Sequence, residues 1–272
     1  MPSVPVWDPQ VYLQHADHRT RPFLDLLTRI PELPDTGRPP RIADLGCGPG
    51  NVTALLADRW LDAHITGYDS SPEMLAAAAV HAGPTPGGGR LDFAPADIGQ
   101  WEPPGEFDLI VSSAALQWVR GHAESFKSWL EALPPGGVLA FQVPGNFIAP
   151  SHALLGELCD TPRWRERLGE QGRRYVHILE PYEYLQRLAD LGCAADVWET
   201  TYVRLLQGTD PVLEWVRGTA LRPVLTALAD DPRAQDAFLD EYRERLRAAY
   251  PPGPHGTAFP FRRVFAVARK AH

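Results

Sequence analysis

Three glycines at alternate positions follow a short apolar stretch that contains a carboxylate. The stretch is Ile42-Ala-Asp44-Leu45, and Gly46, Gly48 and Gly50 come after it, ahead of the helix-like run 52–57. Glycine allows a tight turn there and lets a ligand approach the backbone with no Cβ in the way. The spacing G-x-G-x-G differs from the G-x-G-x-x-G of dinucleotide-binding loops. The pattern therefore indicates a strand–loop–helix unit whose loop can lie close against a ligand, and it disfavours a nicotinamide dinucleotide.

A second acidic residue, Asp69, ends the strand-like segment 64–69 and lies 19 residues after Gly50. A carboxylate in this position can hydrogen-bond both hydroxyls of a ribose. Ser70 follows at the expected start of a helix, where hydroxyl side chains cap the first turn, and Met74 lies within that turn. Together with the glycine loop, these residues predict a nucleoside-binding strand–helix–strand unit.

Composition excludes several classes of protein. The chain has 272 residues, 44% of them apolar, with eight tryptophans and a net charge of −8. This charge disfavours a nucleic-acid partner, which needs a basic face. No apolar run approaches the roughly 20 residues of a membrane span, and no signal peptide is evident. The three cysteines share no metal-ligand spacing, so we expect a reduced, cytoplasmic protein with no metal and no obligate protein partner.

Strand-like and helix-like segments alternate in the first half of the chain, which predicts a doubly wound, mostly parallel sheet. The five expected strands are 42–45, 64–69, 91–97, 107–112 and 138–143. Ligands of such sheets bind at the carboxyl ends of the strands. The glycine loop, Asp69, Asp97 and Ser113 all lie at those ends.

The other segments predict a helical cap on the same domain. Two further strands are expected at 197–206 and 258–269, as an antiparallel hairpin at the sheet edge. Helices are expected at 146–174 and at 211–250, the latter broken at Pro223 and near Pro232. We also expect a break at Arg19–Pro22 between two N-terminal helices, and a flexible turn at 83–89. The prediction is a single domain, 1–272, with a cofactor-binding core at 36–146 and cap or lid segments at 1–31, 147–180 and 208–257.

Several motifs together resemble the trans-aconitate methyltransferase family of the class I S-adenosylmethionine-dependent methyltransferases. They are Trp7-Asp-Pro-x-x-Tyr-Leu13, Arg19-x-Arg21-Pro22, Ala43-Asp-Leu-Gly-Cys-Gly-Pro-Gly-Asn51, Asp69-Ser-Ser-Pro72, Leu116-Gln-Trp118, Trp215 and Leu221-Arg-Pro223. The resemblance runs almost from end to end. It implies a Rossmann-like α/β fold with a seven-stranded sheet, mostly parallel, with an antiparallel C-terminal edge hairpin and a helical cap over the active site. Ser113 is a departure, since this family is expected to have asparagine there.

The resemblance also implies S-adenosylmethionine as the cofactor and S-adenosylhomocysteine as its product. It places Arg19 near the cofactor carboxylate, Met74 against the adenine, and Asp97 and the backbone N–H of Ile98 at the adenine edge. Ser113 can accept a hydrogen bond from the cofactor's amino group. The full expected set is Arg19, Asp44, Gly46, Gly48, Asp69, Ser70, Met74, Asp97, Ile98, Ser113 and Trp118.

The substrate implied by the resemblance is a small polycarboxylate, trans-aconitate, which would be methyl-esterified. A carboxylate is ionised at neutral pH, so it is itself the nucleophile and no catalytic base is required. The protein has to hold it in line with the methyl group, and arginine forks suit this task. The expected substrate-binding residues are Gln117, His177, Tyr202, Trp215, Arg222 and Arg263.

Three alternatives stay open. The same fold could methylate another small carboxylic acid or metabolite. A nicotinamide-dependent oxidoreductase is disfavoured by the loop spacing and by the lack of a catalytic Tyr-Lys or His-Arg pair. A non-catalytic nucleoside sensor would keep the glycine loop and Asp69 but would not need a basic substrate pocket.

Overall fold

The computed structural model describes residues 16–169 and 178–271, and for residues 16–19 it describes the backbone only. These residues form two compact units. The first, here called the sheet unit, comprises Trp7–Val143, His177–Glu199 and Arg263–His272, as far as they are described. The second, the helical unit, comprises the described parts of Pro144–Val176 and Thr200–Arg262.

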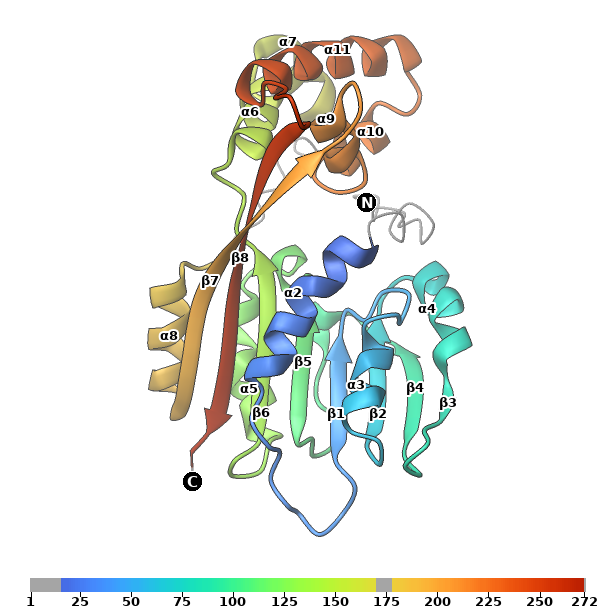
Figure 1. Cartoon of the computed structure of the whole chain (residues 1–272), viewed down its shortest axis with the longest axis vertical. Coiled ribbons are helices and arrows are strands. Elements are labelled where there is room, and N and C mark those ends of the chain that lie inside the picture. The colour runs from blue at the N-terminus through green and yellow to red at the C-terminus, as the bar shows by residue number, and fades with distance from the viewer. Residues whose placement is uncertain (1–15, 170–177, 272) are drawn as a thin grey trace. The chain divides into compact units, whose positions relative to one another are not determined.

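The described strands form one sheet in the order β3-β4-β2-β1-β5-β6-β8-β7 (Figure 1). Strand β1 pairs in parallel with β2 and β5, β2 with β4, and β5 with β6. Strand β8 runs opposite to its neighbours β6 and β7 (Figure 1). The mostly parallel sheet with an antiparallel C-terminal edge is therefore confirmed. The bounds are β1 (Arg41–Leu45), β2 (His64–Asp69), β3 (Gly83–Pro84), β4 (Arg90–Pro95), β5 (Leu109–Ser113), β6 (Val138–Pro144), β7 (Cys193–Leu206) and β8 (Thr257–Lys270).

The eighth strand, β3, corrects the expected count of seven. It lies in the segment 83–89 that was expected to be a turn, and it pairs antiparallel with β4 through Gly83–Leu91 and Pro84–Arg90. Proline lacks a backbone N–H, so it is tolerated in a strand at a sheet edge. A two-residue strand of this kind leaves no alternating pattern for sequence reasoning to detect.

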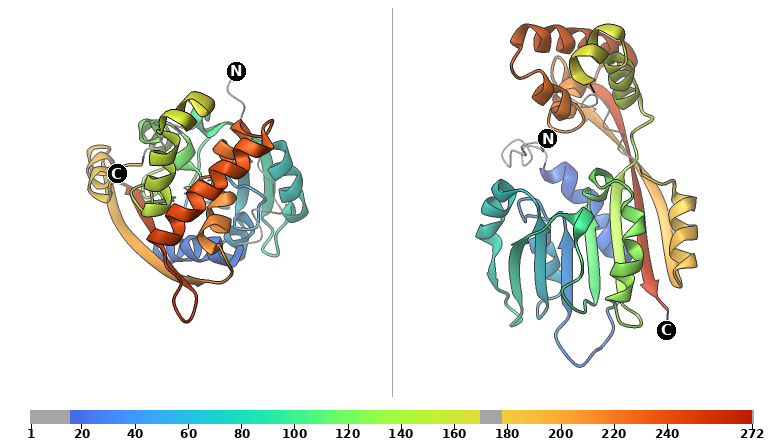
Figure 2. Two further views of the ribbon diagram at one scale, coloured as in Figure 1. Left: turned by 90° about the horizontal axis from the view of Figure 1, so that it is seen from above. Right: turned by 180° about the vertical axis from the view of Figure 1, so that it is seen from behind.

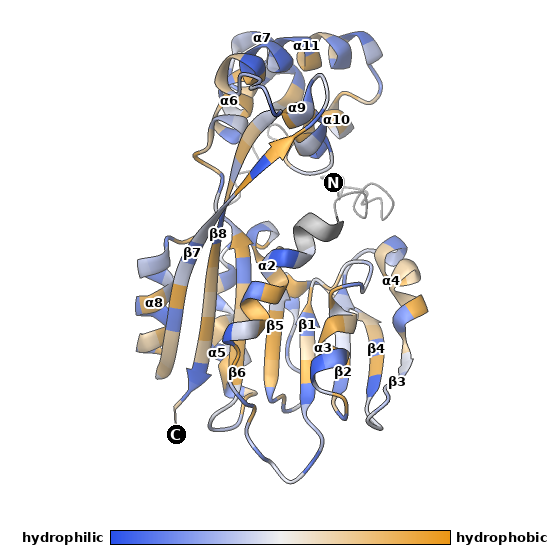
Figure 3. Ribbon diagram, viewed as in Figure 1, coloured by the Kyte–Doolittle hydropathy of each residue, from blue (hydrophilic) through white to orange (hydrophobic). Residues whose placement is uncertain are grey.

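Helices pack on both faces of the sheet (Figures 1 and 2). On one face lie α2 (Ala16–Arg29) and α3 (Thr53–Arg59), with α4 (Pro72–Ala78) beside β4. On the other face α5 (Phe126–Glu131) and α8 (Pro181–Asp190) pack together through Phe126 and Tyr184, whose ring centroids are 6.3 Å apart. Strands β1 and β5 are largely hydrophobic along their lengths (Figure 3), and all but one residue of each is buried, as is usual for parallel strands at the centre of a sheet.

The expected break at Arg19–Pro22 is wrong, because α2 runs through Pro22 to Arg29. A proline inside a helix costs about 3 kcal/mol. The turns around it bury Phe23, Leu26 and Leu27, at 0%, 0% and 6% exposure. Each such side chain contributes about 1.5–3 kcal/mol on burial, so the packing outweighs the cost of the proline.

The helical unit has a hydrophobic core of its own, which includes Trp164, Phe238, Tyr242 and Phe259. Its helices are α6 (Pro150–Cys159), α7 (Pro162–Leu168), α9 (Pro211–Arg217), α10 (Arg222–Ala227) and α11 (Pro232–Ala249). The expected breaks at Pro223 and Pro232 are confirmed, since α10 and α11 each begin at or beside a proline. Strands β7 and β8 both continue from one unit into the other. None of the described helices is long and apolar enough to cross a membrane.

Candidate cofactor site

The acidic and hydroxyl residues of the expected cofactor site lie where four neighbouring parallel strands end. Asp44 is the penultimate residue of β1, Asp69 ends β2, Ser113 ends β5, and Asp97 follows two residues after β4. These strands are consecutive in the sheet, in the order β4-β2-β1-β5. Parallel strands end at one edge, so the fold collects these side chains there, as the strand pattern predicts.

The glycine loop after β1 depends on glycine for two physical reasons. Gly46, Gly48 and Gly50 have φ angles of 77°, 54° and 78°, a left-handed region that disfavours side chains. A Cβ on Gly46 would lie 2.2 Å from the Cβ of Ala115, whereas a Cβ on Gly48 would meet nothing within 4 Å. The loop is therefore packed on one side at Gly46 and leaves an open cradle at Gly48.

Neighbouring strands hold this loop in place. The carbonyl oxygen of Tyr68 accepts the N–H groups of Gly46 at 2.8 Å and Cys47 at 3.0 Å. The next residue, Asp69, accepts the Gly48 N–H at Oδ2 and the Ser71 N–H at Oδ1, both at 2.9 Å. A carboxylate oxygen has more than one acceptor site, so Asp69 can order the loop and still bind ribose hydroxyls.

Asp44 supplies a buried acceptor next to the loop. Its side chain is 1% exposed, and Oδ2 accepts the Thr53 hydroxyl at 2.6 Å. Oδ1 is buried with no hydrogen-bond partner among the described residues. Desolvation raises the pKa of Asp44 to about 7, helped by the charge of Asp69 and opposed by the Thr53 hydrogen bond. A buried, unmatched carboxylate oxygen fits a ligand that brings a donor, such as an ammonium group.

This pKa predicts how cofactor affinity depends on pH. In the empty protein protonated Asp44 is favoured, so its contribution to stability declines as pH rises from the usual carboxylate range towards 7. A cationic amino group prefers ionised Asp44, so the affinity for S-adenosylhomocysteine should rise between about pH 6 and about pH 8, by up to about tenfold per unit below the pKa. Calorimetric titrations across this range test it. Asp44→Asn should flatten the profile, and an unchanged profile in that variant would contradict the assignment.

The turn after β5 forms the other wall of the glycine loop. Ala114 has a φ of 55°, and it is the only non-glycine residue in the described ranges with a positive φ. The N–H of Ala114 donates to the Gln142 carbonyl at 2.9 Å. The carbonyl oxygen of Ala114 accepts from the side-chain amide of Gln117 at 2.6 Å. Strain of this kind costs on the order of 1–3 kcal/mol and is common at functional sites.

Sequence reasoning missed Gln142, which links two of the expected site residues. Its amide nitrogen donates to Ser113 Oγ at 2.8 Å, and its Oε1 accepts from Arg263 Nη1 at 2.9 Å. A guanidinium has only donors, so Arg263 fixes which way the amide faces and makes Ser113 Oγ an acceptor from it. A single amide in the otherwise apolar strand 138–143 was the signal that could have revealed this role.

The remaining expected cofactor residues take up varied positions. Met74 is buried in the first turn of α4, and Ser70 is exposed. Asp97 accepts the Gly99 N–H at 2.9 Å and so caps the short helix Ile98–Gln100. Trp118 ends the short helix Leu116–Trp118. The side chain of Arg19, in α2, lies outside the described residues.

The expected substrate-binding residues divide between the two units. Gln117 and Arg263 belong to the sheet unit, and both are 6% exposed. Tyr202, Trp215 and Arg222 belong to the helical unit. Trp215 packs into that unit's core against Phe259 and Phe261, whereas Arg222 is half-buried at the start of α10. His177 lies outside the described residues. Their roles toward a substrate stay a prediction.

The contrast between two loop glycines gives a matched test. Gly46→Ala places a Cβ against Ala115, so the backbone has to move, and we expect a loss of more than about 2 kcal/mol of stability. Gly48→Ala carries only the left-handed backbone penalty, about 1–2 kcal/mol. Its methyl group would, however, occupy the open space beside Gly48 in which the cofactor is expected to lie. Melting curves should show the larger drop for Gly46→Ala. Cofactor titration should show a clear loss for Gly48→Ala, and equal stability of the two variants would contradict the packing argument.

The geometry suits S-adenosylmethionine: an unmatched acceptor on Asp44, an open glycine cradle, and a loop-bound carboxylate at the end of β2. A sheet of this topology with this site defines the class I methyltransferase fold. The family model described as "Methyltransferase domain" matches residues 42–137. Among solved structures, YcgJ of Bacillus subtilis aligns with a TM-score of 0.55 at 15% identity, over 94% of this chain and 99% of that one.

Two sequence relatives specify the family further. The chain is 65% identical to a Streptomyces coelicolor protein named trans-aconitate 2-methyltransferase, over 98% of this chain and 88% of that one. It is 62% identical to the Streptomyces avermitilis protein of the same name, over 98% of each chain. The chain belongs to the trans-aconitate 2-methyltransferase family.

Proposed function

We propose that the protein transfers the methyl group of S-adenosylmethionine to a carboxylate of trans-aconitate. The observation that supports this most strongly is the 65% identity, across nearly the whole chain, to the Streptomyces coelicolor protein of that name. A carboxylate oxygen forms the new bond to the methyl carbon, and the carbon–sulfur bond breaks. Its electron pair stays on sulfur, which becomes the thioether of S-adenosylhomocysteine.

The side chains of the protein have three tasks in this reaction. The glycine loop, Asp69 and Asp44 hold the cofactor, which supplies an electrophilic methyl group when bound. Ser113, fixed by Gln142, offers an acceptor to the cofactor's amino group. No proton has to be removed, because the substrate carboxylate is already ionised at neutral pH, and alignment of the nucleophile is the main requirement.

We further propose that arginine side chains hold the carboxylates that do not react. Arg222 and Arg263 are the strongest candidates, since a guanidinium binds a carboxylate through two parallel hydrogen bonds. The buried position of Arg263, beside Gln142 and Ser113, suits a ligand near the cofactor. Gln117, Tyr202, Trp215 and His177 complete the proposed set. The three free cysteines are all buried, which agrees with the proposed cytoplasmic location and the absence of any need for disulfides.

A product assay tests the function. The protein is incubated with methyl-labelled S-adenosylmethionine and a panel of mono-, di- and tricarboxylates, and product masses are read. We expect a monomethyl ester, with trans-aconitate giving the highest kcat/KM. Preference for a different acid would support the alternative of another small carboxylate substrate. If none of these acids causes release of S-adenosylhomocysteine, carboxyl methylation is contradicted.

Hydrogen exchange tests the participation of the helical unit. If Trp215 and Arg222 bind substrate, amides in α9 and α10 should exchange more slowly when S-adenosylhomocysteine and a polycarboxylate are both present. Ligand-binding segments come from the less stable parts of a structure, so these short helices should be less protected than β6 in the empty protein. Protection equal to that of β6 before any ligand is added would contradict a lid role.

A further inference from the structure

One stretch of the sheet has no helix over it. In this strand order the chain has to cross from β4 over β2 and β1 to reach β5, and such crossovers are usually helices. Here the connection 96–108 contains only the three-residue helix Ile98–Gln100. Seen from behind in Figure 2, no helix of the described chain lies across β1 and β2. Trp101, in the same connection, packs on Tyr68 of β2, with 5.3 Å between ring centroids.

The sequence of β2 reflects the absence of a helix over this face. A central parallel strand is normally apolar on both faces, but β2 carries His64, Thr66 and Tyr68 at alternate positions on this face. His64 is exposed, and Thr66 and Tyr68 are half-buried. The strand therefore has polar side chains facing a region that the fold leaves uncovered.

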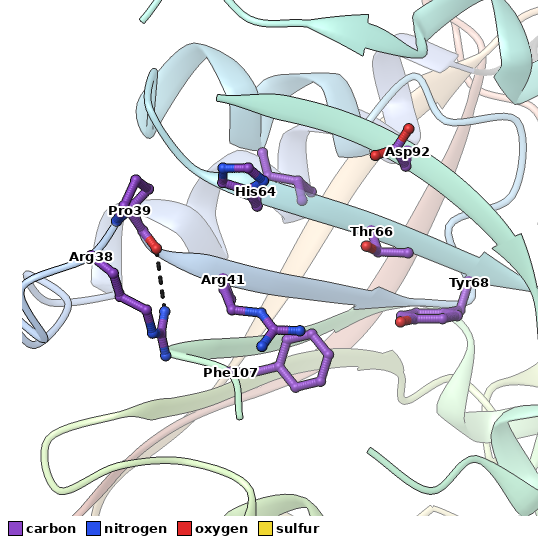
Figure 4. Close-up of a pocket in the computed structure, with 9 residues that line it drawn as sticks. Arg38, Pro39, Arg41, His64, Thr66, Tyr68, Asp92 and Phe107 are labelled. Atoms are coloured by element: carbon purple, nitrogen blue, oxygen red, sulfur yellow. Dashed lines mark hydrogen bonds between the residues drawn. The ribbon is translucent and has the colours of Figure 1, made fainter. Parts of the chain in front are cut away.

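A cavity of about 440 Å³ occupies this region (Figure 4). This is within the range of small-molecule sites, roughly 300–1,000 Å³. It extends along the uncovered face of β2, from His64 at the start of the strand to the side chain of Tyr68 near its end. Its lining residues are Arg38, Pro39, Arg41, His64, Ile65, Thr66, Tyr68, Asp92 and Phe107.

The charge of this cavity is opposite to that of the protein. The chain has 34 acidic and 26 basic residues, yet the lining has two arginines, a histidine and one acid. That acid, Asp92, accepts hydrogen bonds from Arg90 Nε at both carboxylate oxygens, at 2.9 and 2.8 Å. Arg38 pairs with buried Asp108 at 2.7 Å. The cavity thus keeps one arginine, Arg41, whose charge is not matched by a neighbouring carboxylate among the described residues.

The backbone of Arg41 is fixed by a hydrogen bond, whereas the N–H groups of its guanidinium are available to a ligand. Its backbone N–H donates to Asp108 Oδ2 at 2.7 Å, which anchors the residue at the start of β1. Its guanidinium lies over the Phe107 ring, 5.5 Å from the centroid, and is exposed. No hydrogen-bond acceptor for this guanidinium exists among the described residues. In Figure 4 the Tyr68 hydroxyl points toward it, so two kinds of donor converge on the same space.

We propose that this cavity binds a small multivalent oxyanion, bearing phosphate or carboxylate groups, at a site separate from the methyl-transfer site. Arg41 is its main ligand through the planar fork that matches such groups. The hydroxyls of Thr66 and Tyr68 are further hydrogen-bond partners, and the guanidinium also packs over the Phe107 ring.

The test uses the whole protein saturated with S-adenosylhomocysteine. Backbone amide NMR spectra are recorded during titration with inorganic pyrophosphate and, separately, with tricarballylate. We expect saturable shifts at the amides of Arg38, Arg41 and residues 64–68 with at least one probe, and the tighter probe shows whether phosphate or carboxylate is preferred. Shifts restricted to the glycine loop and α10, or none below about 10 mM, would overturn the proposal.

Variants locate the binding. Arg41→Gln should weaken it at least fivefold, and Arg41→Lys should recover part of it. Arg165→Gln is the matched control: it removes one charge from a side chain that is 57% exposed in the helical unit, and it should change binding less than twofold. Thr66→Val is a second lining variant, expected to weaken binding while methylation of trans-aconitate stays at the parent rate. Equal affinities for Arg41→Gln and Arg165→Gln, or for Thr66→Val and the parent, would overturn the proposal.

Discussion

Asp69→Ala is expected to raise the dissociation constant of S-adenosylhomocysteine at least about a hundredfold. If Asp69 binds both ribose hydroxyls, the variant loses two charge-assisted hydrogen bonds, each worth about 1.5–3 kcal/mol. The structure adds a second cause, because the same carboxylate accepts the N–H groups of Gly48 and Ser71. The variant therefore loses both a ligand contact and an anchor of the glycine loop. Calorimetric titration measures the change.

Asp69→Asn separates the two causes. The amide keeps the shape and one acceptor oxygen, so it can still receive one backbone N–H, and its affinity should lie between those of the parent and the alanine variant. The same titration with NAD should give no binding to the parent protein. An unchanged dissociation constant in Asp69→Ala would remove this residue from the cofactor site, and tight NAD binding would revive the oxidoreductase.

Arg222→Ala is expected to lower kcat/KM on trans-aconitate by about 30- to 5,000-fold. If its guanidinium pairs with a substrate carboxylate, the variant leaves that carboxylate poorly compensated, at a cost on the order of 2–5 kcal/mol. The backbone of Arg222 is fixed, since its N–H donates to Thr219 O at 3.1 Å and its carbonyl accepts the Thr226 hydroxyl at 3.0 Å. Steady-state rates on trans-aconitate give the result.

Two comparisons make the Arg222 experiment specific. Arg222→Lys should recover only part of the efficiency, because an ammonium cannot offer the planar fork. Arg217→Ala is the matched control in the neighbouring helix α9, with a side chain 44% exposed and a loose contact of 3.5 Å to Glu214, and its effect should stay under about 0.5 kcal/mol. Cofactor affinity should be nearly intact in all three. Parity of Arg222→Ala with the parent enzyme would exclude Arg222 as a substrate ligand.

Local signals were enough to predict the cofactor half of the protein. The glycine spacing, Asp69 at the end of its strand, and the alternation of strand and helix are short-range features, and each has a direct backbone cause. Left-handed φ angles require glycine, and parallel strands bring their carboxyl ends to one edge. For the same reason the helix starts at Pro72, Pro223 and Pro232 were readable: proline suits a first helical turn.

Features that depend on contacts between residues distant in the sequence could not be predicted from the sequence. Pro22 looks like a helix break until the burial of Phe23, Leu26 and Leu27 is known. Gln142 looks like an isolated polar residue until β5 and β8 place Ser113 and Arg263 on either side of it.

The sequence by itself determined the cofactor class, the family and the parallel sheet, because these rest on residue types at fixed spacing along the chain. Only the tertiary structure decided that Asp69 holds the glycine loop, that Asp44 is buried with a raised pKa, and that β2 faces an uncovered cavity. Burial, pairing and charge compensation depend on neighbours supplied by other strands and helices. Those neighbours are set by the way the chain crosses the sheet, and spacing along the sequence does not specify them.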